Sequence, residues 1–274
     1  MGDLGGPGPV AGDTEHVCVA GLQFVDAVEH VADELAQKHA RCEAALGTAL
    51  LGAQDSWPRN DGGTSTSATD NSTPYLTDNP GAGNNPATLT GGATWAADPA
   101  RGEVLSLDGT SGYASTDGSV LNTAGSYSVS AWVSLGSTIA SSAAIGQDGS
   151  TTSAFQLGYD SGTGRWDFDL STADATHPTG VEVSSAGSPA TGTWTHPVGV
   201  HDANAKTISL SVNGVLQQTA PDTTAWNAAG PLTFGRIKLN GANAWFFPGE
   251  ISDAQAWNYA LTPTQIRALY QQVN

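Results

Sequence analysis

The segment Ser126–Leu135 alternates between two kinds of side chain. One side carries only apolar residues, which are Tyr127, Val129, Ala131, Val133 and Leu135. The other side carries serines and Trp132. Because successive side chains of a strand point to opposite faces of its sheet, the pattern predicts a strand with one face in a core. Trp132 is a large ring on the polar face, so it either lies under a loop or is offered to a ligand.

Other short segments repeat this alternation. Apolar residues occupy every second position in 155–159, 166–170 and 208–212, and turn-forming residues separate these runs at 160–164 and at Asn213-Gly214. Short strands of this kind, joined by tight turns without intervening helices, predict a mostly β protein. With one apolar face on each strand, they are expected to form a two-sheet antiparallel sandwich.

The C-terminal end changes to helical signals. Thr262 and Gln265 have the spacing of a capping box, and Pro263 occupies the first helical position. We therefore expect a short helix carrying Ile266, Leu269 and Tyr270, and we expect it to seal one end of the sandwich.

The N-terminal part is different. Residues 15 to 51 have apolar or seam residues at alternating spacings of three and four, which are Val25, Val28, Ala32, Leu35, His39, Cys42, Leu46 and Ala49. The spacing predicts an amphipathic helix that either docks on a partner surface or associates with itself as a coiled coil. In one straight helix Cys18 and Cys42 would lie about 36 Å apart, so they pair between chains, or the segment folds back, or they stay reduced. We divide the chain into an N-terminal segment, 1–53, and a β-domain, 54–274.

Net charge limits the classes of partner that we expect. The formal net charge is −17 and the pI is about 4.3, which repels phosphates and anionic lipid head groups. We therefore expect no nucleic-acid or membrane-surface partner, and neutral sugars and cations remain as partners. The given sequence shows neither a secretory signal peptide nor an apolar run of membrane-spanning length.

A series of motifs covers the chain from about residue 54 to its end. In order they are Trp57–Thr64, Asn84–Trp95, Leu105–Tyr113, Tyr127–Val133, Phe155–Tyr159, Gly192–His196, Ser211–Gly214, Phe234–Arg236, Phe247–Asp253 and Asn258–Ile266. This series resembles the laminin-G-like, concanavalin A-like jelly-roll family of secreted bacterial proteins. The resemblance implies a jelly-roll sandwich and an extracellular, noncatalytic binding module that recognises carbohydrate, such as a cell-surface polysaccharide. The alternative is a structural or protein-binding domain whose N-terminal helix mediates association.

The sequence gives little support for catalysis. Glu103, Glu182 and Glu250 are the only glutamates of the β-domain, and the Glu-x-Asp-x-x-Glu spacing of jelly-roll hydrolases is missing. Asp167 and Asp169 project from one strand, either as a solvated strand face or as a catalytic pair. A facing carboxyl across a cleft would favour the catalytic pair. We expect no enzyme.

Calcium is the cofactor that the resemblance implies. Related domains carry a structural calcium near the rim, which would place Asp108 and Asp253 among its ligands. Asp108 is alternatively only a turn former. His196 and His201 are five residues apart on one strand and should face opposite ways, which speaks against joint metal binding.

Ligand contacts are predicted around Trp132, since sugar sites combine a flat aromatic ring with a few polar groups. Gln156, Asp167 and Asp169 are expected to share its sheet face, with Trp245 and Phe246 on a loop near the rim. Arg236 is expected to be a structural ion-pair partner.

Overall fold

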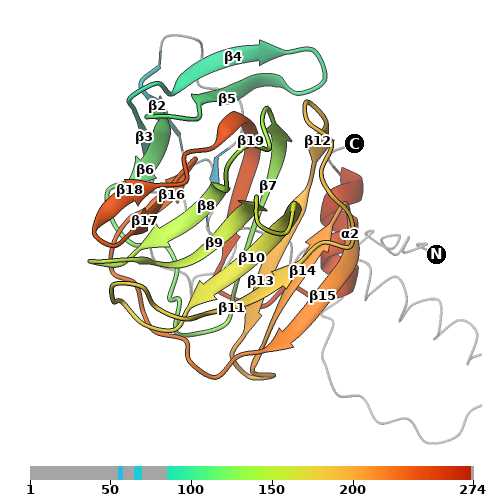
Figure 1. Ribbon diagram of the computed structural model, residues 1–274. Coiled ribbons are helices and arrows are strands. Elements are labelled where there is room, and N and C mark those ends of the chain that lie inside the picture. Colours follow the sequence, from blue (N-terminus) through green and yellow to red (C-terminus); the bar gives the residue numbers. More distant parts are fainter. Residues whose placement is uncertain (1–54, 58–64, 70–84, 273–274) are drawn as a thin grey trace, which may run out of the picture. The chain divides into compact units, whose positions relative to one another are not determined.

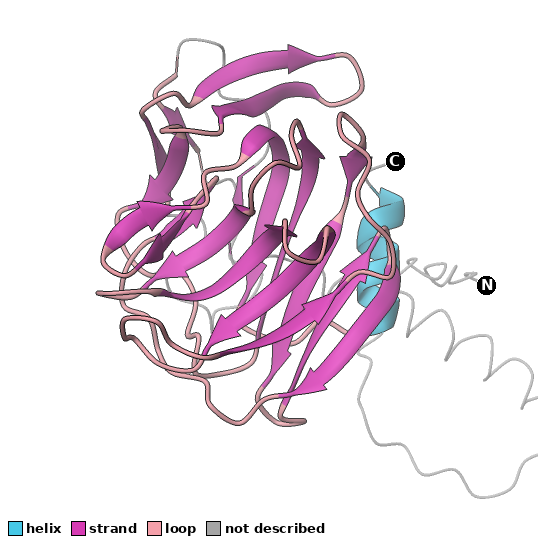
Figure 2. Cartoon of the chain, in the orientation of Figure 1, coloured by secondary structure: helices cyan, strands magenta, loops and turns pink. Residues whose placement is uncertain are grey.

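The computed structural model describes residues 55–57, 65–69 and 85–272, and these form a mostly β domain (Figures 1 and 2). Two large sheets face each other, and a single short helix lies outside them among the described residues (Figure 2). The two-sheet antiparallel sandwich and the short C-terminal helix are confirmed. The predicted N-terminal helix, with Cys18 and Cys42, lies outside the described residues.

Sheet I is built around the strand with which the sequence pattern began, β7 (Tyr127–Leu135). Its main path, in spatial order, is β15 (Val215–Pro221), β14 (Thr207–Val212), β13 (Pro197–Asp202), β7, β19 (Pro248–Trp257), β5 (Gly102–Asp108) and β4 (Thr94–Asp98). Two short strands join it, β1 (Asp55–Trp57) on β19 and β12 (Trp194–Thr195) on β7.

Sheet II lies on the other side of the core. In spatial order it holds β11 (Gly180–Ser184), β10 (Arg165–Ser171), β9 (Ser153–Asp160), β8 (Ser142–Asp148), β16 (Leu232–Phe234), β6 (Tyr113–Thr116), β3 (Ala87–Thr90) and β2 (Ser67–Ala68). A separate hairpin of β17 (Ile237–Leu239) and β18 (Ala242–Ala244) follows β16.

The core between the sheets contains the apolar sides of the predicted strands. Tyr127 of sheet I packs on Phe155 and Phe168 of sheet II, with ring centroids 5.1 Å and 6.4 Å apart. All three rings are almost completely buried. Ring pairs at these distances add to the burial of apolar area, so they hold the two sheets face to face.

Helix α2 (Pro263–Gln272) begins with the predicted capping box. The Thr262 N–H donates to Gln265 Oε1 over 2.8 Å, and the Gln265 N–H donates to Thr262 Oγ1 over 3.3 Å. The prediction that this helix seals one end of the sandwich is wrong, however. Its Ile266 and Leu269 form a second core with Val198 and Val200, which face outward from β13, so the helix covers the outer face of sheet I.

The hairpin β17–β18 lies over the outer face of sheet II. Gly146 of β8 permits this approach, because a Cβ on Gly146 would lie 2.9 Å from Cγ2 of Ile237. The Thr152 hydroxyl also donates to the Lys238 carbonyl over 3.3 Å. The hairpin therefore walls one side of the exposed face of sheet II.

Candidate functional site

The outer face of sheet II carries the polar sides of β9, β10 and β11. Since Phe155, Phe168 and Val183 point into the core, Gln156, Asp167, Asp169 and Glu182 must point outward. The strand register makes Asp169 the direct neighbour of both Gln156 and Glu182. Directly paired residues have Cβ atoms about 5 Å apart, so this face gathers three carboxyl groups and one amide.

A cavity of about 270 Å³ opens on this face. Its floor contains Gln156 and Asp169, and the hairpin residues Ile237 and Leu239 line one wall. The segment 177–180, between β10 and β11, lines the cavity as well. Trp245, from the segment after β18, also lines the cavity, together with Thr152, Ser153, Phe155 and Ser171. We call this cavity the sheet II cleft.

The backbone of Trp245 is held in an unusual conformation. Its φ of 53° lies in the left-handed region, which a bulky residue rarely adopts. The Ala143 N–H donates to the Trp245 carbonyl over 2.8 Å and ties this segment to the edge of β8. Left-handed backbone of this kind concentrates at binding and catalytic sites, where the surroundings enforce it.

Hydrogen bonding on the cleft floor is incomplete. Gln156 Nε2 donates to Asp167 Oδ2 over 2.6 Å. Gln156 Oε1, Asp167 Oδ1 and Asp169 Oδ1 are buried and accept no hydrogen bond from the described residues. A buried polar atom without a partner costs about 1–3 kcal/mol, so these three oxygens are costly features unless a ligand or water completes them.

The surroundings of the cleft raise the pKa values of two of its carboxyl groups. Burial raises the pKa of Asp169 to about 6, and the charges of Glu182 and Asp160 add to the rise. Burial also raises the pKa of Asp167 well above its ordinary value, with contributions from Asp169, Glu182 and Asp160. Raised carboxyl pKa values in a concave site are a recognised mark of functional residues.

Gly180 leaves space beside Asp169. A Cβ built on Gly180 would lie 2.5 Å from Asp169 Oδ1, which is too close for a side chain to fit without displacing the carboxyl group. The unpaired oxygen therefore faces a region that any larger residue at position 180 would fill.

Trp132 lies on the other sheet, which corrects the expectation that it shares a face with Gln156, Asp167 and Asp169. Its ring is 3% exposed. The Arg101 guanidinium stacks 3.4 Å from its centroid, and the Tyr270 ring of α2 stacks at 5.5 Å. Trp132 is thus covered, and we leave it out of the cleft.

The two rim aromatics also separate. Trp245 lines the cleft, whereas Phe246 packs near Tyr113, with ring centroids 6.5 Å apart. Gln156, Asp167, Asp169 and Trp245 are the predicted residues that the structure brings together.

Asp108 and Asp253, the two predicted calcium ligands, are each engaged with neighbouring groups of the chain. Asp108 Oδ1 accepts from the backbone N–H groups of Thr110, Ser111 and Gly112, and its Oδ2 accepts from two hydroxyls of the same turn. Hydrogen bonds from Ser111, Thr110 and Gly112 hold the pKa of Asp108 far below its ordinary value. These hydrogen bonds within one turn favour the alternative in which Asp108 is a turn former.

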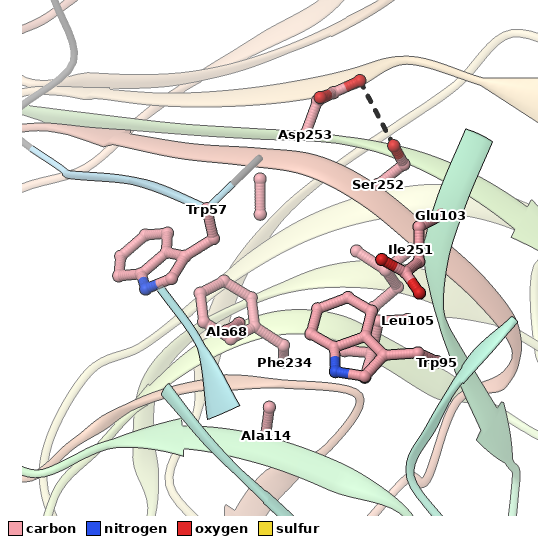
Figure 3. Close-up of a pocket in the computed structure, with 11 residues that line it drawn as sticks. Trp57, Ala68, Trp95, Glu103, Leu105, Ala114, Phe234, Ile251, Ser252 and Asp253 are labelled. Atoms are coloured by element: carbon pink, nitrogen blue, oxygen red, sulfur yellow. Dashed lines mark hydrogen bonds between the residues drawn. The ribbon is translucent and has the colours of Figure 1, made fainter. Parts of the chain in front are cut away.

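Asp253 is engaged elsewhere. It forms an ion pair with Arg101 at 3.4 Å and accepts from the Ser252 hydroxyl at 3.2 Å. Figure 3 shows it at the edge of a small apolar pocket, of about 30 Å³, lined by rings such as Trp57 and Trp95. In the described part of the chain no group of three or more His, Cys, Asp and Glu side chains is arranged to hold a metal ion. Calcium remains a prediction without support from these two residues.

The two histidines face opposite ways, as the strand pattern predicts. His196 packs on Trp132 outside sheet I, with ring centroids 5.0 Å apart, whereas His201 packs on Tyr127 at 5.3 Å inside the sandwich. Burial lowers the pKa of His196 to about 3, and Arg101 contributes to the shift. Arg236 is the structural ion-pair partner that we expected, because its Nη1 donates to both carboxylate oxygens of Asp148 over 2.9 Å and 2.7 Å.

Glu182 and Gly180 are functional candidates that the sequence analysis did not select. Both lie on β11, which joins the site only through its pairing with β10. The alternation of Val181 and Val183 would have placed Glu182 on an outward face. It does not predict which strand pairs with β11, however.

Comparison with solved structures shows what this arrangement is similar to. The binding domain of botulinum neurotoxin serotype D superposes with a TM-score of 0.58 at 13% identity, covering 81% of this chain and 52% of that one. The sialidase of Trypanosoma rangeli in complex with the inhibitor DANA gives a TM-score of 0.55 at 14% identity, covering 79% and 32%. The chain thus spans about half the length of the toxin domains, and at these identities the likeness concerns the fold.

One toxin relative, the binding domain of botulinum neurotoxin DC, was solved in complex with SialylT and separately with rat synaptotagmin II, with TM-scores of 0.58 in both cases. Identities are 13%, and each covers 81% of this chain and 52% of the other. No curated protein matches the sequence. No helix within the described ranges is long and apolar enough to cross a membrane.

A family model also matches the sequence itself. It covers residues 108–267, from the end of β5 into α2, which is more than half of the chain. The chain therefore belongs to the laminin-G-like family described as the concanavalin A-like lectin/glucanases superfamily.

Proposed function

We propose that this chain is a noncatalytic extracellular binding module that recognises a glycan in the sheet II cleft. The observation that carries the proposal is the set of three buried, unpaired acceptor oxygens on Gln156, Asp167 and Asp169. Sugar hydroxyls are abundant donors, and a ligand that supplies them would remove the cost of leaving these oxygens unpaired.

The shape and lining of the cleft support this ligand class. A volume of about 270 Å³ is close to the lower end of small-ligand sites. Trp245 provides the flat aromatic surface that sugar sites combine with placed polar groups. An acidic chain with a net charge of −17 disfavours polyanionic ligands, so neutral glycans are preferred over sulfated or phosphorylated ones.

Gly180 provides a direct test. Full-length protein is titrated against a panel of neutral, amino and anionic oligosaccharides by calorimetry, with thermal unfolding as a second readout. Gly180→Ala should weaken binding of any hit about tenfold or more, because its Cβ would occupy the space beside Asp169 Oδ1. Gly187→Ala is the matched control, since a Cβ there meets nothing within 4 Å. Flat binding across the panel would reject the proposal.

A hydrolase of unusual design is the competing function. The Asp169 carboxyl, with its pKa raised to about 6 beside other carboxyls, has one property of a general acid. A glycosidase also needs a second carboxyl across the scissile bond. Glu182 is instead the neighbour of Asp169 on the same sheet. Release of new reducing ends from a bound glycan, abolished by Asp169→Asn, would favour the hydrolase over the binding module.

A further inference from the structure

The cleft floor offers acceptors in excess of donors. Gln156 Nε2 already donates to Asp167, and the Thr152 and Ser153 hydroxyls donate to the Lys238 carbonyl and to Asp148. The unpaired oxygens of Gln156 and Asp169 belong to lining residues, and a third lies on Asp167 beside them. The Ser171 hydroxyl and the His177 ring are further polar groups of the lining. A ligand group that pairs with these oxygens must be a hydrogen-bond donor.

The charges around the floor have one sign. Asp167, Asp169 and Glu182 face outward together, and Asp160 raises the pKa of both aspartates. Among the described residues, the cavity lining contains no lysine or arginine. The three cations nearest in sequence are engaged elsewhere, since Arg165 donates to the Ser185 carbonyl, Lys238 to the Gly149 carbonyl and Arg236 to the Asp148 carboxylate.

From these observations we infer that the cleft selects a glycan bearing a primary ammonium group, an unacetylated amino sugar, which it holds at the Asp169 carboxylate beside Gln156. This inference rests on the proposed glycan function and names its ligand class. An ammonium group has three N–H donors and no acceptor, which complements a floor of unpaired oxygens.

Gly180 keeps the surroundings of the Asp169 carboxyl group free of a side chain. Charge-assisted N–H···O bonds have donor–acceptor distances of about 2.7–2.9 Å. A Cβ on Gly180 would lie 2.5 Å from Asp169 Oδ1, closer than this range, so any side chain at position 180 would displace the carboxyl group that receives the ammonium. Asp169 and Gln156 are directly paired across β10 and β9, so the unpaired amide oxygen of Gln156 lies on the same sheet face as this carboxyl group.

Binding should depend on pH. The titratable groups facing Asp169 are Asp167, Glu182 and Asp160, with His177 on the lining segment, while the hairpin wall contributes the apolar Ile237 and Leu239. An ammonium group favours the ionised carboxylate, so affinity for it rises as Asp169 loses its proton. A neutral sugar lacks this preference.

The test compares two ligands that differ in acetylation. The full-length chain is titrated calorimetrically with a β-1,4-linked glucosamine tetramer and with the matching N-acetylglucosamine tetramer at pH 5 and pH 7. The amino tetramer should bind about tenfold more tightly than the acetylated one at pH 7, and this preference should shrink at pH 5. At pH 6 its binding should release protons, measured in two buffers of different ionisation enthalpy.

Two variants test whether the preference for the amino tetramer arises at Asp169 and Gly180. Asp169→Asn should remove the preference for the amino tetramer, and Gly180→Ala should weaken that ligand about tenfold. Asp117→Asn, which changes an exposed carboxylate outside the cleft, should leave both affinities unchanged. Circular dichroism confirms that each variant is folded.

The outcomes separate the two proposals. Equal affinity for both tetramers, or tighter binding of the acetylated one, overturns the inference and leaves glycan recognition standing. Binding of a lysine-rich peptide with no response to any sugar overturns both, because the ammonium would then belong to a protein partner. An amino-sugar preference that survives Asp169→Asn also overturns the inference.

Discussion

Gln156 Nε2 donates to Asp167 Oδ2 over 2.6 Å, and this bond orients the remaining oxygen of each side chain without giving it a partner. Gln156 and Asp167 are 4% and 1% exposed, so water does not solvate them freely. The arrangement costs stability and leaves one unpaired oxygen on Gln156, which lines the cleft, and another on Asp167 beside it. Binding sites commonly retain such costs, because the groups that destabilise the free protein are those that meet a ligand.

Asp169→Asn should therefore stabilise the free protein at pH 7. The substitution keeps the shape of the side chain and removes a buried charge next to Glu182, and we expect the free energy of unfolding to rise by about 1–3 kcal/mol. Urea denaturation at pH 7 measures this change. At pH 4.5 the gain should largely disappear, because Asp169 is then protonated in the wild type. A loss of stability at pH 7 would contradict this account of the cleft.

The wild-type protein should lose stability as pH rises from about 4 to 7. Asp169 has a pKa of about 6 in the folded chain against 3.8 for an ordinary aspartate, so between these values the folded state holds more protons than the unfolded state. The difference corresponds to about 3 kcal/mol at most, fully lost above pH 6. Below about pH 4 stability should fall as the pH is lowered further. The pKa of Asp108 is lowered in the folded chain, so the unfolded chain binds a proton there more readily. Denaturation profiles of wild type and Asp169→Asn check the assignment, since the variant should show a flatter slope.

Asp108→Ala should destabilise the protein equally in calcium and in chelator. Its carboxylate accepts five hydrogen bonds within one turn, from Thr110, Ser111 and Gly112. Removing them should cost about 1–3 kcal/mol. Thermal unfolding with either additive is the measurement. A destabilisation seen only when calcium is present would instead support the calcium interpretation of this aspartate.

Breaking the Arg236–Asp148 pair should affect both stability and the cleft. Arg236→Met leaves a carboxylate that is 1% exposed without its main partner, and we expect a loss of about 3 kcal/mol. Arg236 directly precedes β17, so the hairpin wall should loosen and glycan affinity should fall. The double variant Arg236→Met/Asp148→Asn should recover part of the stability, because it removes the stranded charge. Equal stability of the single and double variants would argue against the ion pair as the cause.

The sequence by itself determined the local geometry of this protein. Period-two alternation assigned the two faces of β7, β9, β10 and β14, because a strand has only two directions for its side chains. The Thr262–Gln265 spacing located the start of α2, since four orphan N–H groups at a helix start need nearby acceptors. Alternation also set His196 and His201 on opposite faces.

Only the tertiary structure decided which faces meet. The outward sides of β7 and β9 both carry polar residues, yet Trp132 is covered by Arg101 and Tyr270, while Gln156 lines an open cleft. The pairing that sets Glu182 beside Asp169, and the glycine that leaves Asp169 Oδ1 room, are likewise set by strand register. The physical reason is that side-chain alternation is a property of one strand. A cleft depends instead on sheet order, on register and on the elements packed over each face. These are fixed by contacts between residues far apart in the chain.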